Sequence, residues 1–232
     1  MDAVFTVRDG PTGESLRYAL RGLHENVDTD EVWMVGSTPG WVRKHHQIDV
    51  EQRWDRWHNT SHSLLAVCEH PDVSDPFMLW NDDFFALRPV IHLDWCHGPM
   101  RTFPDVDKVS RAYLQGRDDT LRYLREHDGF LDPLSFDLHV PLVVHKDVMA
   151  QAVRDTMAIA VPWKRSAYGN RALRAGLIPR PTTRPDPKIF DLESLPGPDW
   201  DWLSSAPYAF TVGAVGRWVR ERFPDPSPYE RI

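Results

Sequence analysis

Residues 77–85 read FMLWNDDFF, and this stretch decides the fold class. Its four leading apolar residues predict a buried strand, because a short apolar run bounded by polar residues is typical of the middle of a sheet. Two adjacent carboxylates, Asp82 and Asp83, follow at once. In α/β proteins ligands bind at the carboxyl ends of strands. The pair is therefore a candidate site for Mg²⁺ or Mn²⁺ together with a substrate phosphate, although an acidic turn after a strand explains the same residues.

The N-terminal residues predict a unit of strand, helix and strand. Residues 3–7 form the first predicted strand, and a helix capped by Thr12 runs to about Asn26. Residues 31–35 form the second strand. Two strands joined by one helix over this length indicate a parallel pair with a right-handed crossover.

The rest of the chain continues the alternation less clearly. Helices are predicted over 63–69, 107–127 and 146–158, with one further strand over 138–144. Residues 42–62 show no periodic pattern, and the proline-rich residues 178–198 predict an extended surface segment. We therefore expect an α/β fold of the Rossmann type, a single domain over residues 1–232 with a mainly parallel sheet flanked by helices.

Composition excludes several classes of protein. A net charge of −7 argues against a protein that coats nucleic acid through its phosphates. The two cysteines form no Cys-x-x-Cys pair, so we expect reduced thiols and no structural zinc. The chain contains no apolar window long enough for a membrane span and does not start like a signal peptide, so we expect a cytoplasmic protein. Dinucleotide-binding, Walker and nucleophile-elbow motifs are also missing from the sequence.

Several short motifs together resemble one known family. Residues 14–21 read ESLRYALR, residues 58–62 read HNTSH and residues 81–85 read NDDFF. These resemble the ELRYSLRS, FNSH and NDD motifs of the Stealth family, in the same order. Between them, residues 32–42 read VWMVGSTPGWV, which is similar to that family's next strand and P-x-W-L loop. The family contains bacterial capsular polysaccharide phosphotransferases and the catalytic subunit of the lysosomal N-acetylglucosamine-1-phosphotransferase.

Three further regions extend the resemblance along the chain. Residues 2–7 (DAVFTV) resemble the family's opening strand, and residues 139–149 contain its His-x-Pro motif and the start of the helix after it. Residues 223–230 (FPDPSPYE) resemble its closing FP-x-PS-x-x-E, which we expect to pack on the domain as a C-terminal strap. The chain departs from the family at residues 202–207 (WLSSAP), where many members carry another acidic motif. It is also shorter than most members.

The resemblance implies an activity and a set of site residues. Family members transfer a sugar-1-phosphate from a nucleotide sugar to a hydroxyl, on a catalytic domain related to the GT-A glycosyltransferases. It implies that Asp82 and Asp83 hold the metal, that His139 acts as base or phosphate ligand, and that Arg171 stabilises phosphate charge. The implied contacts to substrate are Asp2, Arg17, Asn59, Asn81, Ser166 and Asn170. Residues 1–100 would then form the nucleotide-sugar and metal half, and residues 101–232 the acceptor half.

Other interpretations stay open at this point. The same residues could serve a glycosyltransferase that releases a nucleoside diphosphate, and the acceptor could be a glycan, a protein or a modified nucleobase. A binding protein without turnover is a second class, which the altered residues 202–207 favour. A metal-dependent phosphohydrolase fits less well, because no further cluster of acids or histidines has suitable spacing. Asp2, Arg17, His139 and Arg171 each also have an ordinary structural explanation as terminal, surface or hydrogen-bonded residues.

Overall fold

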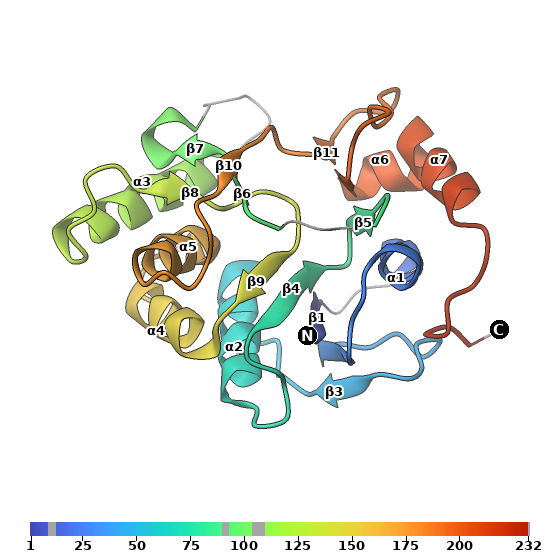
Figure 1. Ribbon diagram of the computed structural model, residues 1–232, viewed down its shortest axis with the longest axis horizontal. Coiled ribbons are helices and arrows are strands. Elements are labelled where there is room, and N and C mark those ends of the chain that lie inside the picture. Colours follow the sequence, from blue (N-terminus) through green and yellow to red (C-terminus); the bar gives the residue numbers. More distant parts are fainter. Residues whose placement is uncertain (9–12, 90–92, 104–109, 232) are drawn as a thin grey trace.

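A five-stranded sheet forms the centre of the protein. The computed structural model describes residues 1–8, 13–89, 93–103 and 110–231. The sheet has the order β3-β2-β1-β4-β9 (Figure 1). Its strands are β1 (Ala3–Val7), β2 (Val32–Gly36), β3 (His46–Ile48), β4 (Phe77–Asn81) and β9 (Leu142–Val144). β1 to β4 are mutually parallel, whereas β9 runs antiparallel to β4.

The strand order places a switch point beside the acid pair. From β1 the chain moves outward to β2 and β3, and then returns to place β4 on the other side of β1. In open α/β sheets such a reversal opens a crevice at the carboxyl ends of the two central strands, where ligands bind. Thr6 of β1 lies opposite Asn81 of β4, so Asp82 and Asp83 follow at this edge.

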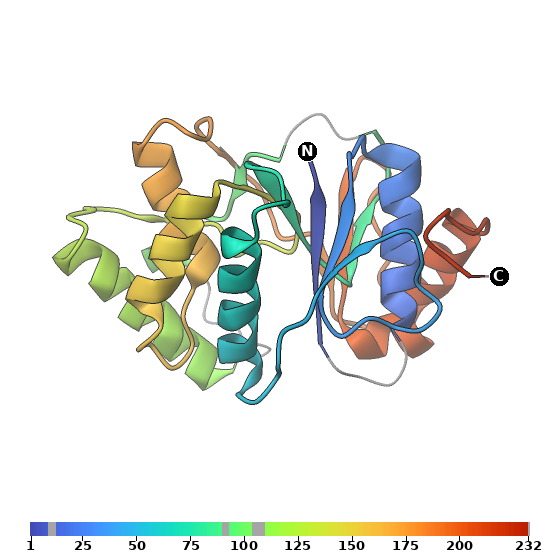
Figure 2. The same ribbon diagram turned by 90° about the horizontal axis from the view of Figure 1, so that it is seen from below.

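Helices cover both faces of the sheet. On one face Phe5 and Met34 pack with Leu20 of α1 (Glu14–Asn26). On the other face Val4 and Leu79 share a core with residues of α2 (Arg56–Glu69), α3 (Arg111–Glu126), α4 (Lys146–Thr156) and α5 (Lys164–Arg174). This follows from the alternation of side chains along a strand, since a sheet covered on both faces buries both sets. Figure 2 shows the resulting three layers, with α1 and α2 on opposite sides.

A second sheet joins distant parts of the chain. It has the order β11-β12-β5, where β5 (Phe84–Ala86) begins directly after Asp83. β11 (Lys188–Ile189) and β12 (Trp202–Ser205) therefore lie next to the acid pair. The remaining elements are β6 (Trp95–Cys96), β7 (Gly98–Pro99), η1 (Met100–Thr102), β8 (Leu134–Ser135), β10 (Thr182–Thr183), α6 (Pro207–Val212) and α7 (Ala214–Arg222).

The α/β class is confirmed, but the sheet arrangement is more mixed than expected. The expected strands over 3–7, 31–35 and 77–80 agree with β1, β2 and β4 to within one residue. The expected strand over 138–144 is too long, because only Leu142–Val144 pairs with β4. The strands outside the central sheet pair in both directions. The Thr12 cap and the start of the expected helix over 107–127 fall outside the described residues.

Two other expectations need correction. The helix expected over 63–69 begins at Arg56, because the Asp55 side chain caps it by accepting hydrogen bonds from the backbone of Trp57 and His58. The proline-rich residues 178–198 are not merely an extended surface segment, because they contribute β10 and β11. β11 brings Lys188 to the acid pair.

Glu230, a buried acid near the C-terminus, attaches the C-terminal strap (residues 223–230) to α1. The fully buried Glu230 accepts hydrogen bonds from Arg21 at 2.8 Å and from the backbone N–H of Ser227 at 2.8 Å, and it also pairs with Arg17. Burial raises the pKa of Glu230, but its hydrogen bonds from Arg21, Ser227 and Arg17 outweigh that effect and lower it to about 2. The backbone of Glu230 also forms an antiparallel β-bridge with Val42, in the loop after β2.

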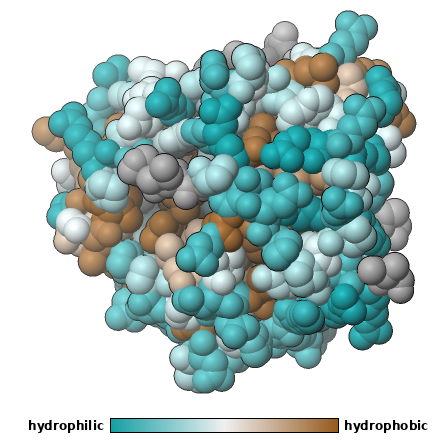
Figure 3. Space-filling model, turned by 45° about the vertical axis from the view of Figure 1, so that its right-hand side comes forward, coloured by the Kyte–Doolittle hydropathy of each residue, from teal (hydrophilic) through white to brown (hydrophobic). Residues whose placement is uncertain are grey.

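The surface is largely hydrophilic on the face shown in Figure 3, with hydrophobic residues gathered in smaller patches. Among the helices that the structure describes, none combines the length and the apolar character needed to cross a bilayer. Cys68 and Cys96 are both free thiols.

Candidate active site

Asp83 is fixed by two side chains from the second sheet. Its Oδ2 accepts hydrogen bonds from Lys188 Nζ at 2.9 Å and from Ser204 Oγ at 3.0 Å. Lys188 is largely buried, with 12% of its side chain exposed. A partly buried ion pair with a second hydrogen bond holds a carboxylate in one orientation. Asp83 therefore joins the end of β4 to the C-terminal third of the chain.

Asp82 has different surroundings from its neighbour. Burial and the adjacent charge of Asp83 raise the pKa of Asp82 to about 6. A nearby cation would relieve this unfavourable concentration of negative charge. Mg²⁺ is commonly bound through one or two carboxylates, with substrate phosphates and water completing its shell, so the pair fits such an ion. Across the described residues there is no group of three or more acids, histidines and cysteines that could hold a metal without substrate.

Asp186 holds the side chain of His139 in one orientation. The Asp186 carboxylate accepts a hydrogen bond from the His139 backbone N–H at 3.1 Å and another from Nδ1 at 2.7 Å. Burial raises the pKa of Asp186, but these hydrogen bonds and the charge of His139 outweigh it and lower the pKa overall. Because Nδ1 donates to the carboxylate, Nε2 is the ring nitrogen that can accept a proton.

One short segment connects the histidine to the acid pair. Asp186 binds His139, and Lys188, at the start of β11, binds Asp83. From the other side, the ring of Phe84, the residue after Asp83, lies edge-on to the His139 ring at 6.3 Å between centroids. The predicted residues Asp82, Asp83 and His139 are therefore brought together, with Asp186 and Lys188 as partners that the sequence did not single out.

Arg165 lies close to this group, and the charge of Arg8 also acts on Asp82. Burial lowers the pKa of Arg165, and the charges of Asp137, Asp186 and Asp83 partly offset the effect. Its Nη2 donates to the Val140 carbonyl at 2.5 Å, whereas its buried Nε has no hydrogen-bond partner among the described residues. A half-buried cation with an unused donor can bind an oxyanion. Arg165 was not among the residues that the sequence singled out.

Arg171 lies elsewhere on the same helix. Its Nε and Nη2 donate to Asp128 at 2.7 and 3.0 Å, and its Nη1 donates to Asp155 at 2.8 Å. Arg165 and Arg171 are six residues apart in α5, which corresponds to about 9 Å along the helix axis. The two side chains therefore leave the helix at different positions along its length. Within the described chain Arg171 serves to tie α5 to α4 and to the end of α3, and its predicted phosphate contact stays a prediction.

Three of the predicted substrate contacts, Asp2, Arg17 and Asn81, lie in different parts of the fold. Asp2 lies at the amino end of β1, opposite the acid pair, and its carboxylate accepts hydrogen bonds from Trp33 Nε1 and the Ser74 backbone at 2.9 Å each. Arg17 pairs with Glu230 in the strap. Asn81, in contrast, is the last residue of β4 and directly precedes the acid pair.

The other three are buried and hold local backbone. Ser166 contacts Asp137 and accepts a hydrogen bond from the Phe136 N–H at 2.9 Å. Asn170 accepts a hydrogen bond from the Leu134 N–H at 2.8 Å. Both residues of α5 thus fix the segment that leads into His139. The Asn59 side chain accepts a hydrogen bond from the Trp54 N–H and donates one to the Trp54 carbonyl, in the loop before α2.

Two curated exopolysaccharide phosphotransferases are similar to this chain over part of their length. The chain is 25% identical to an exopolysaccharide phosphotransferase of Streptomyces coelicolor over 177 residues, which cover 61% of this chain and 28% of that protein. It is 23% identical to an exopolysaccharide phosphotransferase of Nocardia farcinica over 278 residues, which cover 94% of this chain and 53% of that protein. The chain thus spans about half the length, or less, of these curated relatives. No protein-family model matches the chain.

Proposed function

We propose that this protein transfers a sugar-1-phosphate from a nucleotide sugar to a hydroxyl of a glycan, and that it is a compact member of the Stealth family with a GT-A-related domain. One observation carries the proposal. At the switch point between β1 and β4, an acid pair, a histidine–carboxylate pair and a half-buried arginine converge. Such a set suits the transfer of a phosphoryl group between two oxygens.

Each residue has a place in the reaction. The acceptor hydroxyl attacks the phosphorus that carries the sugar, a new P–O bond forms, and the bond to the nucleoside monophosphate breaks. Nε2 of His139 takes the proton of the acceptor, and Asp186 holds the ring in the orientation that this requires. Arg165 lies where its charge and unused donor would stabilise the transferring phosphoryl group.

Asp82 and Asp83 would hold Mg²⁺ or Mn²⁺ with the diphosphate of the donor. When bound, the ion would neutralise charge on the leaving nucleotide. Lys188 and Ser204 orient Asp83, so that Asp82 is the carboxylate with most to gain from a cation. The names of the curated relatives support polysaccharide phosphotransfer, and the motif resemblance supports a nucleotide sugar as donor.

The test is a panel of nucleotide sugars incubated with the protein and Mn²⁺ or Mg²⁺, with the released nucleotide identified by mass. Release of nucleoside monophosphate is expected, with water replacing the acceptor, and Asp82→Ala and His139→Ala should abolish it. Release of nucleoside diphosphate would make the protein a glycosyltransferase instead. If no nucleotide sugar is turned over but one raises the melting temperature, the protein binds the donor without catalysis.

A further inference from the structure

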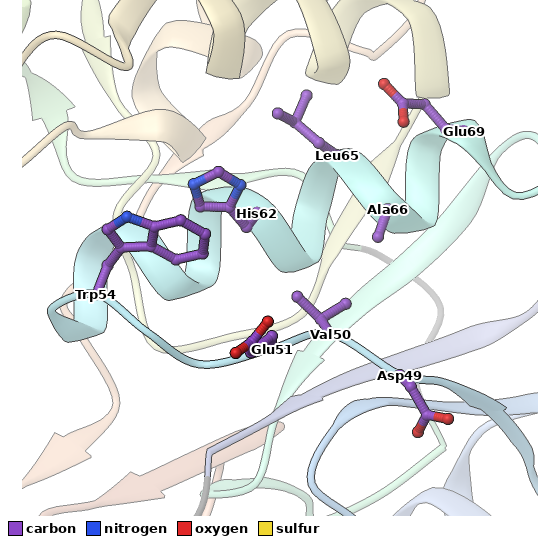
Figure 4. Close-up of a pocket in the computed structure, with 8 residues that line it drawn as sticks. All are labelled: Asp49, Val50, Glu51, Trp54, His62, Leu65, Ala66 and Glu69. Carbon is purple, nitrogen blue, oxygen red and sulfur yellow. The ribbon is translucent and has the colours of Figure 1, made fainter.

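A surface groove lies beside α2, outside the group of residues just described. It has a volume of about 370 Å³ and lies between the start of the loop after β3 and the length of the helix (Figure 4). Its lining residues are Asp49, Val50, Glu51, Trp54, His62, Leu65, Ala66 and Glu69. Figure 4 shows Trp54 and His62 together at one end, with Asp49 and Glu69 toward the other.

At one end of this groove, Trp54 provides an aromatic surface that is both exposed and held in place. The residue is 49% exposed, although an indole ring ordinarily gains from burial. Its ring stacks on His62 with centroids 3.9 Å apart and an interplanar angle of 16°. The Asn59 side chain accepts a hydrogen bond from the Trp54 N–H at 2.9 Å and donates one to its carbonyl at 2.8 Å. A ligand that covers this ring therefore pays little ordering entropy.

The charges around the groove indicate what kind of ligand it fits. Glu51 is paired with Arg53, and Glu69 is paired with Arg154 at 2.7 Å. Asp49 accepts a hydrogen bond from Gln47 at 3.1 Å. The acids at the rim are thus largely compensated, so the groove has little demand for a cationic peptide. Their oxygens can still accept hydrogen bonds from hydroxyl groups.

The groove lies on the side of the molecule where transfer would occur. The loop leaves the carboxyl end of β3, which is parallel to β1 and β4. Gln52 of this loop donates a hydrogen bond to the carbonyl of Val7, the last residue of β1, at 2.9 Å. The loop that carries Trp54 is therefore anchored to one strand of the switch point, and the other strand carries Asp82 and Asp83.

We propose that the Trp54 groove binds an uncharged glycan, with a pyranose ring stacked on Trp54 and its hydroxyls hydrogen-bonded to the acidic rim. The proposal rests on the proposed function for its purpose, because the bound chain would be the acceptor that supplies the attacking hydroxyl. Binding itself does not depend on turnover, so the two can be tested apart.

The test is native electrophoresis in gels that contain a soluble neutral polysaccharide, either a dextran, a starch or a β-glucan, with an alginate gel as the anionic comparison. The wild-type protein should be retarded in at least one neutral gel. Trp54→Ala should weaken the affinity roughly tenfold or more, as for an aromatic anchor at an interface. Trp54→Phe keeps a smaller ring and should retain part of the affinity. Tyr208→Ala removes an aromatic residue of α6 that is 65% exposed, and should change nothing.

Three results would overturn the proposal. The first is normal migration of the wild type in every neutral gel. The second is equal retardation of Trp54→Ala and Tyr208→Ala. The third is retardation that a free nucleotide abolishes, because the groove would then be a nucleotide site. Release of nucleotide with water as acceptor is measured in parallel on the wild type and on Tyr208→Ala, and should be the same in both. Glycan binding without any nucleotide release would leave this site standing while the proposed function fails.

Discussion

Asp82 and Asp83 are neighbours in the sequence, yet their carboxylates meet different surroundings. Lys188 and Ser204 compensate Asp83, whereas Asp82 has its pKa raised by burial and by the charge next to it. An acid kept in an unfavourable ionised state is a common feature of a site prepared for a cation. The cost of that preparation should be visible as a dependence of stability on pH.

We predict that the contribution of Asp82 to the free energy of unfolding falls as the pH rises from about 4 through 6. In this range the folded protein retains the proton of Asp82, whose pKa is about 6, whereas the unfolded chain has already lost it. Asp82→Asn should remove this dependence and be more stable than the wild type at pH 7.5, by on the order of 1–3 kcal/mol. Urea denaturation at pH 4.5 and 7.5 measures both effects. Equal stability of the two proteins at pH 7.5 would contradict the assigned environment.

Two of the three arginines of α5, Arg165 and Arg171, allow a matched comparison. Arg165→Lys should lower nucleotide release by about two orders of magnitude, because a lysine cannot reproduce the planar donor array near the phosphoryl group. Arg171→Lys should lower stability by breaking contacts with Asp128 and Asp155, and leave turnover per folded molecule nearly unchanged. Denaturation and initial rates on both variants decide. Loss of turnover in Arg171→Lys alone would support the role predicted for Arg171 from the sequence.

At the scale of elements, two short segments with little regular structure make contacts with residues that are distant in the sequence. Residues 186–188 bind both His139 and Asp83, and the C-terminal strap binds α1 through Glu230. In each case an ion pair joins positions that are distant along the chain. These contacts add to the packing of Phe223 in the strap and Ile189 in β11, which both lie in the core.

We predict that Glu230→Gln destabilises the protein by about 3–5 kcal/mol, because it leaves the largely buried Arg21 without its carboxylate. Glu221→Gln, at an exposed position of α7, is the matched control and should change stability little. Urea denaturation at neutral pH measures both. Because the pKa of Glu230 is lowered to about 2, the contribution is complete above the ordinary glutamate range and is lost as the pH falls toward 2. A neutral effect of Glu230→Gln would mean that the strap does not depend on this pair.

At the scale of the whole molecule, the sequence predicted what local patterns determine. The strands ending at Val7 and Asn81 and the helix between residues 14 and 26 followed from apolar periodicity. The length of α2 did not, because its first turn is polar and aromatic and depends on the Asp55 cap. Lys188 and Asp186 could not be found either, since their partners are 105 and 47 residues away in sequence. Arg165 differs from Arg171 only in its place along a packed helix, which no local pattern reveals.

The whole site should respond to metal and donor together. A divalent cation alone has only the acid pair, whereas the cation with a nucleotide sugar also has the diphosphate, so the combination should stabilise more than either component. A ligand at 100 times its dissociation constant adds about 2.7 kcal/mol, which corresponds to a rise in melting temperature on the order of 5–10 °C. Asp82→Ala should abolish the extra shift. Equal shifts with and without the cation would contradict metal-assisted donor binding.

The most direct measurement is phosphorus-31 NMR of the acceptor after reaction. The protein is incubated with a nucleotide sugar, Mn²⁺ and a neutral oligosaccharide, the metal is removed, and the oligosaccharide product is purified. Our account predicts a phosphodiester signal in that product, dependent on His139 and Asp82. A glycosylated product without phosphorus would contradict sugar-1-phosphate transfer and assign the site to glycosyl transfer.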